Sequence, residues 1–224
     1  MRAMILAAGR GERMRPLTDH CPKPLLEAGG RPLIAHTLDR LAAAGYRDVV
    51  INLAHLGEQI RAALGEQHQG ITLHYSPEPE GALETAGGIR QALPLLGDAP
   101  FLVVNGDVWC DHPLTPPANM STASSGALAH LVLVANPGHH AQGDFGLKGR
   151  SVVLEGGERL TFSGIGWYNP QLFQDLPPGR HALGPLLREA IAAGRVTGEH
   201  YTGDWRDIGT PERLSTLDTE LGQR

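Results

Sequence analysis

The chain has 224 residues, enough for one large domain or at most two small ones. Hydrophobic residues make up 41% of it and charged residues 19%, a globular composition that excludes a largely disordered chain. Its 19 Lys and Arg against 24 Asp and Glu give a net charge of −5, which disfavours a nucleic-acid-binding protein because such proteins need a basic face.

The first half of the sequence alternates short apolar runs with amphipathic segments. We expect strands at 3–6, 49–53, 71–75 and 101–104, and helices at 31–44, 57–64 and 84–93. Strands and helices in alternation are typical of a mostly parallel sheet with helices on both faces. The sequence therefore predicts an α/β fold.

The second half is less regular. We expect a strand at 127–134, two or three antiparallel strands within 144–168, and helices at 183–193 and 210–221. Thr210 is the predicted N-cap of the last helix, and Pro211 stands at its first helical position. Residues 112–126 are rich in proline and serine, and we expect a loop there rather than a linker between domains. The prediction is one domain over residues 1–224.

Signals for export or membrane insertion are lacking. The N-terminal apolar run is too short for a signal peptide, and no run approaches the roughly 18 apolar residues of a membrane span. Cys21 and Cys110 form neither a metal-binding motif nor a disulfide framework, and we assign neither a role. We expect a cytoplasmic protein with no membrane partner and no nucleic-acid partner.

A glycine-rich turn follows the first predicted strand. Residues 6–14, LAAGRGERM, place Gly9 and Gly11 where backbone N–H groups can approach phosphate oxygens. A dinucleotide-binding fingerprint, and with it a hydride-transfer enzyme, is disfavoured because Met14 occupies the position of its third glycine. A P-loop is excluded because neither lysine of the chain stands in a Gly-Lys-Ser/Thr sequence.

Positive charge is concentrated just after this turn. Arg13, Arg15 and Lys23 lie in a short proline-rich segment, and Lys148 is the only other lysine of the chain. Because the chain otherwise uses arginine, a lysine kept between two prolines indicates a need for a compact ammonium group. A cationic, glycine-rich loop beside the carboxyl end of a strand is suited to binding a polyphosphate.

The same segment resembles a known family. Residues 6–18 follow the pattern L-A-A-G-x-G-x-R-x-x-P-L-T and residues 22–25 read P-K-P-L, which resembles the sugar-1-phosphate nucleotidylyltransferases. Further blocks agree with the family in order, at 83–88, 105–107, 163–165 and 205–210. The resemblance implies a single-domain, Rossmann-like mixed sheet flanked by helices, the nucleotide-diphospho-sugar transferase fold. It also implies a nucleotide-binding half at 1–110 and a sugar-binding half at 111–224.

Within this family the chain resembles most the group that uridylylates N-acetylmuramate α-1-phosphate in peptidoglycan recycling. The segments that carry this likeness are at 106–109, 136–140, 143–145 and 160–165. The implied reaction joins UTP and the sugar 1-phosphate to give UDP-N-acetylmuramate and pyrophosphate, with Mg²⁺ as cofactor. Mannose 1-phosphate with GTP, and glucose 1-phosphate with dTTP or UTP, are alternatives within the family. A non-catalytic nucleotide-sugar sensor on the same fold is an alternative from a different class.

The resemblance implies roles for individual residues. Lys23 and Arg13 are expected to hold the triphosphate and neutralise the departing pyrophosphate, and Asp107 and Asp207 are the expected Mg²⁺ ligands. The residues expected to contact the nucleotide are Ala8, Gly9, Gly11, Glu12, Arg13, Lys23, Thr85 and Gly87. The residues expected to contact the sugar are Asn105, Asp144, Gly146 and Gly164.

One stretch departs from the family pattern. Many members carry Glu-Lys-Pro, with the lysine on the sugar phosphate, whereas residues 155–159 here are EGGER and contain no lysine. Arg159 is a candidate replacement for that lysine, and Arg150 or Arg159 is a candidate partner for a carboxylate on the sugar. For His139 and His140 we expect a solvated loop rather than a metal site, because adjacent histidines on a loop rarely both turn to one ion.

Overall fold

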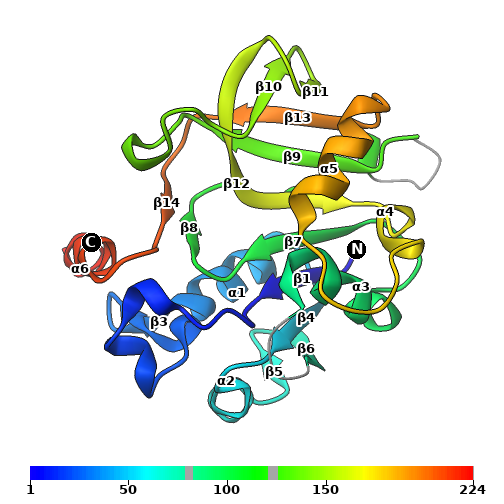
Figure 1. Cartoon of the computed structure of the whole chain (residues 1–224). Helices are drawn as coiled ribbons and strands as arrows, with labels where there is room; N and C mark the ends of the chain where they lie inside the picture. Colours follow the sequence, from blue (N-terminus) through cyan, green and yellow to red (C-terminus); the bar gives the residue numbers. More distant parts are fainter. Residues whose placement is uncertain (79–82, 121–125, 224) are drawn as a thin grey trace.

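The computed structural model of the chain describes residues 1–78, 83–120 and 126–223. A ten-stranded sheet runs through it in the order β10-β11-β13-β9-β12-β7-β1-β4-β6-β5 (Figure 1). The strands of the first half are β1 (Ala3–Leu6), β4 (Asp48–Leu53), β5 (Gln67–His68), β6 (Ile71–Pro77) and β7 (Phe101–Asn105). Those of the second half are β9 (Ala129–Val134), β10 (Phe145–Lys148), β11 (Ser151–Val153), β12 (Glu158–Tyr168) and β13 (Val196–Tyr201).

Strand direction changes at the middle of the sheet. Strands β6, β4, β1 and β7 are parallel neighbours, as the alternation of strands and helices predicts. Strand β12 then pairs antiparallel with both β7 and β9, and β13 returns parallel to β9. The mixed α/β class is confirmed. Its parallel part is smaller than expected, because no crossover helix separates β9 from β12 in the described residues.

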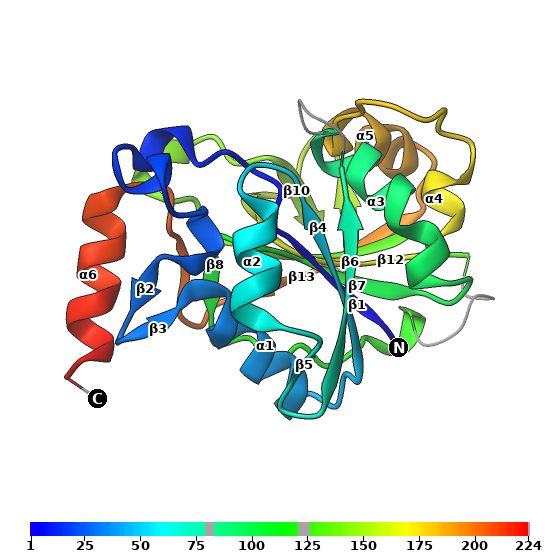
Figure 2. The same ribbon diagram turned by 90° about the horizontal axis from the view of Figure 1, so that it is seen from below.

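The helices are α1 (Leu33–Ala43), α2 (Gly57–Leu64), α3 (Glu84–Leu96), α4 (Gln171–Gln174), α5 (Leu183–Ala192) and α6 (Pro211–Leu221). Two short pairings lie outside the main sheet, β2 (Glu27–Ala28) with β3 (Arg31–Pro32) and β8 (Val108–Cys110) with β14 (Trp205–Asp207). Figure 2 shows α6 beside the β2–β3 hairpin, where the backbone N–H of Gly29 donates to Asp218 Oδ1 at 2.8 Å. None of the described helices is long and apolar enough to cross a membrane.

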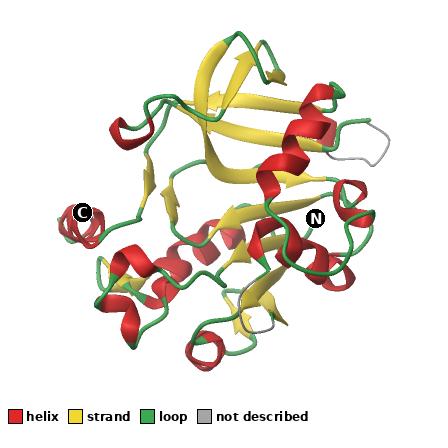
Figure 3. Ribbon diagram, viewed as in Figure 1, coloured by secondary structure: helices red, strands yellow, loops and turns green. Residues whose placement is uncertain are grey.

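Several predicted elements match the structure closely (Figure 3). Helix α2 has the predicted bounds, and α6 begins at Pro211 with the Thr210 side chain accepting from the Arg213 N–H. The first helix starts later than predicted, because residues 31–32 pair with 27–28 as a hairpin. Strands β8, β13 and β14 are not predicted by the sequence. Of the loop expected at 112–126, residues 121–125 lie outside the described residues.

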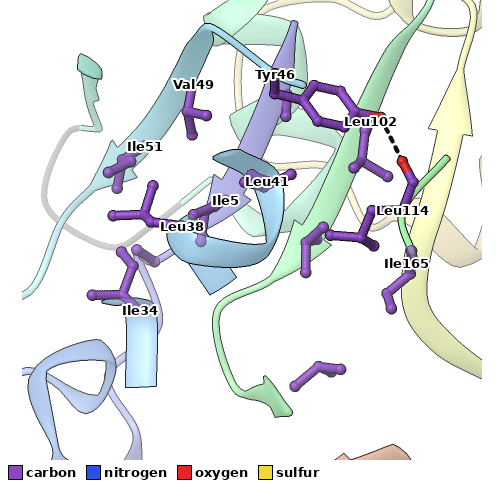
Figure 4. Close-up of a cluster of buried hydrophobic side chains, with 14 of the residues drawn as sticks. Ile5, Ile34, Leu38, Leu41, Tyr46, Val49, Ile51, Leu102, Leu114 and Ile165 are labelled. Atoms are coloured by element: carbon purple, nitrogen blue, oxygen red, sulfur yellow. Dashed lines mark hydrogen bonds between the residues drawn. The ribbon is translucent and has the colours of Figure 1, made fainter. Parts of the chain in front are cut away.

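The hydrophobic core lies on both faces of the sheet, because successive side chains of a strand point to opposite faces. On β1, Ala3 and Ile5 point to one face and Met4 to the other. The first face packs against α1 through side chains such as Leu38 and Leu41, as Figure 4 shows. The second packs against α3 and α5. The sheet is therefore held rigidly between helices, and the carboxyl ends of its parallel strands are fixed in position.

Candidate active site

Two pockets open where β1 and β7 end. The glycine-loop pocket has a volume of about 260 Å³ and is lined by Leu6, Ala7, Ala8, Gly9, Lys23, Pro24, Asn52, Glu78, Glu84, Thr85, Asn105, Gly106 and Asp107. The β12 pocket has a volume of about 360 Å³ and is lined by Arg13, Asn105, Asp107, Val108, Pro137, His139, His140, Asp144, Thr161, Phe162, Ser163, Gly164, Trp205 and Asp207. Asn105 and Asp107 line both, so one elongated molecule can occupy the two pockets together.

The glycine loop is folded so that its lysine reaches the strand ends. Gly11 has a left-handed backbone, with φ of 62°, and a Cβ there would lie 2.9 Å from Thr18 Cγ2 and 3.2 Å from Lys23 Cβ. The Thr18 hydroxyl donates to the Gly11 carbonyl at 2.9 Å. Any other residue at position 11 would separate these segments, so this glycine brings Lys23 against the first turn of the loop.

Lys23 forms an ion pair with the predicted metal ligand Asp107. The Lys23 ammonium donates to Asp107 Oδ2 at 2.7 Å. The lysine side chain is only 11% exposed and the aspartate 31% exposed. Asp107 lines both pockets, and Lys23 lines the glycine-loop pocket. An ammonium held at this position can reach a phosphate group in the glycine-loop pocket.

The second predicted metal ligand reaches the same place from the other end of the chain. Strand β14 pairs antiparallel with β8 in a register that sets Asp207 opposite Val108. The Ile208 N–H donates to the Asp107 carbonyl at 2.9 Å. Asp107 and Asp207, far apart in sequence, therefore lie on neighbouring segments, and both line the β12 pocket.

Three cationic or titratable side chains surround Asp207. Arg213 Nη1 donates to its Oδ2 at 2.8 Å, and His139 Nε2 lies 3.6 Å from the same oxygen. A Cβ at Gly209 would lie 3.1 Å from both Asp207 Oδ1 and Arg13 Nη2, so Arg13 is also beside this carboxylate. The structure thus gathers Arg13, a residue expected to hold the triphosphate, next to Asp207.

The two aspartates fit a magnesium ion by their chemistry. Carboxylate oxygens are the hard ligands that Mg²⁺ prefers, and this ion keeps several waters or phosphate oxygens rather than taking an all-protein cage. Among the described residues no group of three or more His, Cys, Asp and Glu is arranged to hold a metal. Asp107 and Asp207 together therefore suit an ion whose coordination is completed by substrate phosphates.

The predicted sugar contacts divide into two groups. Gly164, with φ of +80°, lies against Asn105, since a Cβ there would be 2.7 Å from Asn105 Nδ2, and both residues line the β12 pocket. Asp144 also lines it, with Oδ2 accepting from the Phe162 N–H at 2.8 Å. Gly146 lines neither pocket in the described part of the chain, and its lack of a side chain admits the Gly156 carbonyl instead.

Some of the residues expected to contact the nucleotide line a pocket, and others do not. Ala8, Gly9 and Thr85 line the glycine-loop pocket, as Lys23 does. Gly11, Glu12 and Gly87 do not line either pocket within the described residues. The Gly87 N–H, inside α3, donates to the His181 carbonyl at 3.1 Å, so this glycine packs against residues 179–181.

Two side chains of the glycine-loop pocket were missed by sequence reasoning. Asn52, inside β4, accepts from the Ala7 N–H at 2.7 Å and donates to Glu78 Oε1 at 2.6 Å. The second oxygen of Glu78 accepts from the Leu83 N–H at 2.8 Å. A polar residue within the apolar run of β4, beside a glycine loop, is the signal that could have identified this pair.

The contacts of Arg150, Arg159, His139 and His140 differ from those that we expected from the sequence. The Arg159 guanidinium donates to four backbone carbonyls, those of residues 142, 143, 144 and 154, so it holds two loops together. Arg150 is exposed and lines neither pocket of the described chain. His139 and His140 are not simply solvated, because each faces a carboxylate, and His140 Nε2 lies 3.1 Å from Asp144 Oδ1.

The two cysteines carry no reactive chemistry here. Burial raises the pKa of the Cys21 thiol, and the nearby charge of Glu27 raises it further. Burial likewise raises the pKa of the Cys110 thiol. Both side chains are therefore protonated thiols near neutral pH, whereas a nucleophilic or metal-binding cysteine needs the thiolate.

Comparison with known proteins shows the family of the chain. The family model for nucleotidyl transferases matches residues 2–151. A protein from Neisseria meningitidis serogroup B, N-acetylmuramate alpha-1-phosphate uridylyltransferase, is 55% identical over 99% of both chains. The chain belongs to the nucleotidyl transferase family. A protein of the same name from Caulobacter vibrioides is 35% identical over 99% of this chain and 97% of its own.

The fold has close matches among solved structures. A Bacillus anthracis protein in complex with sucrose superposes with a TM-score of 0.85, covering 100% of this chain and 96% of its own, at 22% identity. HddC from Yersinia pseudotuberculosis, in complex with GMP-PN, gives a TM-score of 0.79 over 98% of this chain and 99% of its own, at 19% identity. At these identities the likeness concerns the fold, and it extends over the whole described chain.

Proposed function

We propose that this protein transfers the uridylyl group of UTP to N-acetylmuramate α-1-phosphate, giving UDP-N-acetylmuramate and pyrophosphate in cytoplasmic peptidoglycan recycling. The observation that carries the proposal is the 55% identity, over 99% of both chains, with a relative named for this activity. The adjoining pockets support it, because a nucleotide in the glycine-loop pocket and a sugar in the β12 pocket would meet at Asn105 and Asp107.

The reaction needs positive charge more than it needs a base. The nucleophile is a phosphate oxygen that is already an anion at neutral pH, and it attacks the α-phosphorus while pyrophosphate leaves. Two unit charges about 4 Å apart repel by ~4 kcal/mol at an effective dielectric near 20. Lys23 in the glycine-loop pocket and Arg13 in the β12 pocket would offset this repulsion, and we expect both to stabilise charge that builds up on the leaving pyrophosphate.

Asp107 and Asp207 are the residues that would hold Mg²⁺. When bound, the ion would supply charge neutralisation and orientation of the phosphate oxygens. The backbone of Ala8 and Gly9 and the side chain of Thr85 would hold the nucleotide, since all three line its pocket. Asn105 and Asp144 would orient the sugar by hydrogen bonds to its hydroxyl groups.

The test is pyrophosphate release with a panel of substrate pairs. UTP with N-acetylmuramate α-1-phosphate should give the highest kcat/KM. It is compared with UTP and N-acetylglucosamine 1-phosphate, GTP and mannose 1-phosphate, and dTTP and glucose 1-phosphate. A higher kcat/KM for one of the last two pairs would reject N-acetylmuramate α-1-phosphate as the substrate. The protein would still be a sugar-1-phosphate nucleotidylyltransferase. Pyrophosphate release from no pair, with nucleotide sugar still bound, would identify a sensor rather than an enzyme.

A further inference from the structure

A third hollow opens off the β12 pocket, and we call it the α6 hollow. It has a volume of about 260 Å³ and lies between residues 137–139, β14 and the first turns of α6. Pro137, His139, Trp205 and Asp207 line both spaces, so the α6 hollow continues the β12 pocket rather than forming a separate site. A substituent on a sugar bound in the β12 pocket can therefore extend into it.

The lining of the α6 hollow is both apolar and polar. Its apolar residues are Pro137, Trp205 and Ile208, and its polar ones are His139, Arg206, Asp207, Arg213 and Thr216. The Trp205 indole N–H donates to the Ser163 carbonyl at 2.9 Å, which fixes the ring in place. The apolar residues offer a surface to a methyl group, and the arginines offer donors to an anionic group.

Two arginines line the hollow, and they differ in how many of their nitrogens are paired. In Arg206 every guanidinium nitrogen has a partner, with Nε and Nη2 on Asp204 at 2.9 and 3.0 Å and Nη1 on Glu220 at 2.6 Å. Arg213 contacts Asp207 through Nη1 alone. Within the described residues neither Nε nor Nη2 of Arg213 has a hydrogen-bond partner, and the side chain is 31% exposed. The Nε and Nη2 donors form one edge of the guanidinium, the edge that binds a carboxylate with two parallel hydrogen bonds.

We propose that the α6 hollow binds the lactyl arm of N-acetylmuramate and that Arg213 is the residue that recognises its carboxylate. This rests on the proposed function, since that sugar differs from N-acetylglucosamine by a lactyl ether at C3 with one methyl and one carboxylate. The methyl group would pack on Pro137 and Trp205, and the carboxylate would meet Nε and Nη2 of Arg213.

The β12 pocket also holds two carboxylates that would repel a carboxylate on the sugar, Asp144 and Asp207. Of the two, Asp207 has an arginine on it, since Arg213 Nη1 donates to its Oδ2 at 2.8 Å. The two arginines that the sequence offered for this role are elsewhere, since Arg159 donates to backbone carbonyls and Arg150 lies outside the pockets of the described chain. The α6 hollow therefore offers the Nε–Nη2 edge of Arg213, whereas Arg13, the arginine of the β12 pocket itself, is the one expected to hold phosphate groups.

The experiment compares the acid with its neutral amide. In the wild type, kcat/KM for N-acetylmuramate 1-phosphate should exceed that for the lactyl amide by about ten- to hundredfold, the range expected for hydrogen bonds to a charged group. In Arg213→Gln this ratio should fall to near one. Arg213 also contacts Asp207, so the variant is expected to slow every substrate, and the ratio of acid to amide is the readout.

Arg206→Gln is the matched control, because it removes a second guanidinium from the same hollow that is already paired. Its ratio of acid to amide should equal that of the wild type. Equal loss for acid and amide in Arg213→Gln would show that Arg213 serves Asp207 alone and would overturn the proposal. A wild type that does not distinguish acid from amide would overturn it without any variant, so the test stands even if Arg213→Gln does not fold.

These outcomes are separable from failure of the proposed function. A wild type that uses N-acetylmuramate 1-phosphate best, with a ratio that Arg213→Gln leaves unchanged, rejects the lactyl subsite and keeps the activity. A wild type that uses mannose 1-phosphate with GTP best rejects the activity, and the subsite with it.

Discussion

Gly209→Ala should slow catalysis without unfolding the protein. A Cβ at this position would lie 3.1 Å from Arg13 Nη2, 3.1 Å from Asp207 Oδ1 and 3.2 Å from Asp207 Oδ2, where ordinary contact begins at 3.4 Å. The carboxylate and the guanidinium must therefore move by a few tenths of an ångström. If a displacement of about 1 Å costs roughly a hundredfold in rate, this shift should lower kcat by about four- to tenfold.

The assay is pyrophosphate release with UTP, N-acetylmuramate 1-phosphate and Mg²⁺, together with thermal unfolding of the same samples. Gly138→Ala is the matched control, since it lies beside His139 at the same site but has nothing within 4 Å of its added Cβ. Gly138→Ala should not lose stability, because alanine restricts the unfolded chain more than glycine does. Gly209→Ala should lose little, because the atoms that must move are the ends of side chains. Wild-type turnover in Gly209→Ala, or an equal loss in Gly138→Ala, would refute the reasoning.

Three further expectations concern the same site and the core. Asp107→Asn and Asp207→Asn should each lower kcat about a hundredfold or more, roughly 3 kcal/mol of transition-state stabilisation; near wild-type turnover at saturating Mg²⁺ would contradict the metal assignment. Lys23→Ala should lower kcat and raise the KM for UTP. Lys148 is exposed at the end of β10, and Lys148→Ala should change neither constant. Complete rescue of activity by Lys23→Arg would show that no compact ammonium group is needed. Burial lowers the pKa of His130 to about 4 from 6.5, so the unfolded chain takes up the proton first and stability falls as the pH drops between those values. From pH 7 to pH 5 the wild type should lose about 2 kcal/mol of unfolding free energy more than His130→Leu, measured in urea; equal slopes would show an unperturbed imidazole.

Local signals in the sequence predicted much of the fold. Helix α2 ends at Leu64, as Gly65 indicates, and α6 starts after its Thr210 cap, because caps and glycines act within one helical turn. The buried strands of the parallel half were found from their apolar runs. Strand β13 was missed because its sequence, VTGEHY, mixes polar residues with a glycine and has no apolar period.

Contacts between distant segments were beyond the reach of sequence reasoning. Nothing in the sequence indicates that Arg213 will hold Asp207, since that contact depends on where α6 follows β14. The glycines of the family motifs show a related limit. Gly87 and Gly146 lack a Cβ because a neighbouring carbonyl approaches them, and a motif cannot distinguish a glycine that admits a ligand from one that admits the chain.

The pairing of β8 with β14 has a consequence for how this protein becomes active. Asp107 leaves the central sheet at the middle of the chain, and Asp207 reaches it only when the C-terminal segment folds back across β8. A folding intermediate that contains only the parallel half of the sheet lacks the second aspartate. On the proposed metal role of Asp207, removal of the segment after β13 would inactivate the protein while leaving the ten described strands of its sheet in the chain. Turnover thus reports whether the C-terminal segment is docked against β8. Turnover can therefore be lost before the sheet loses any strand.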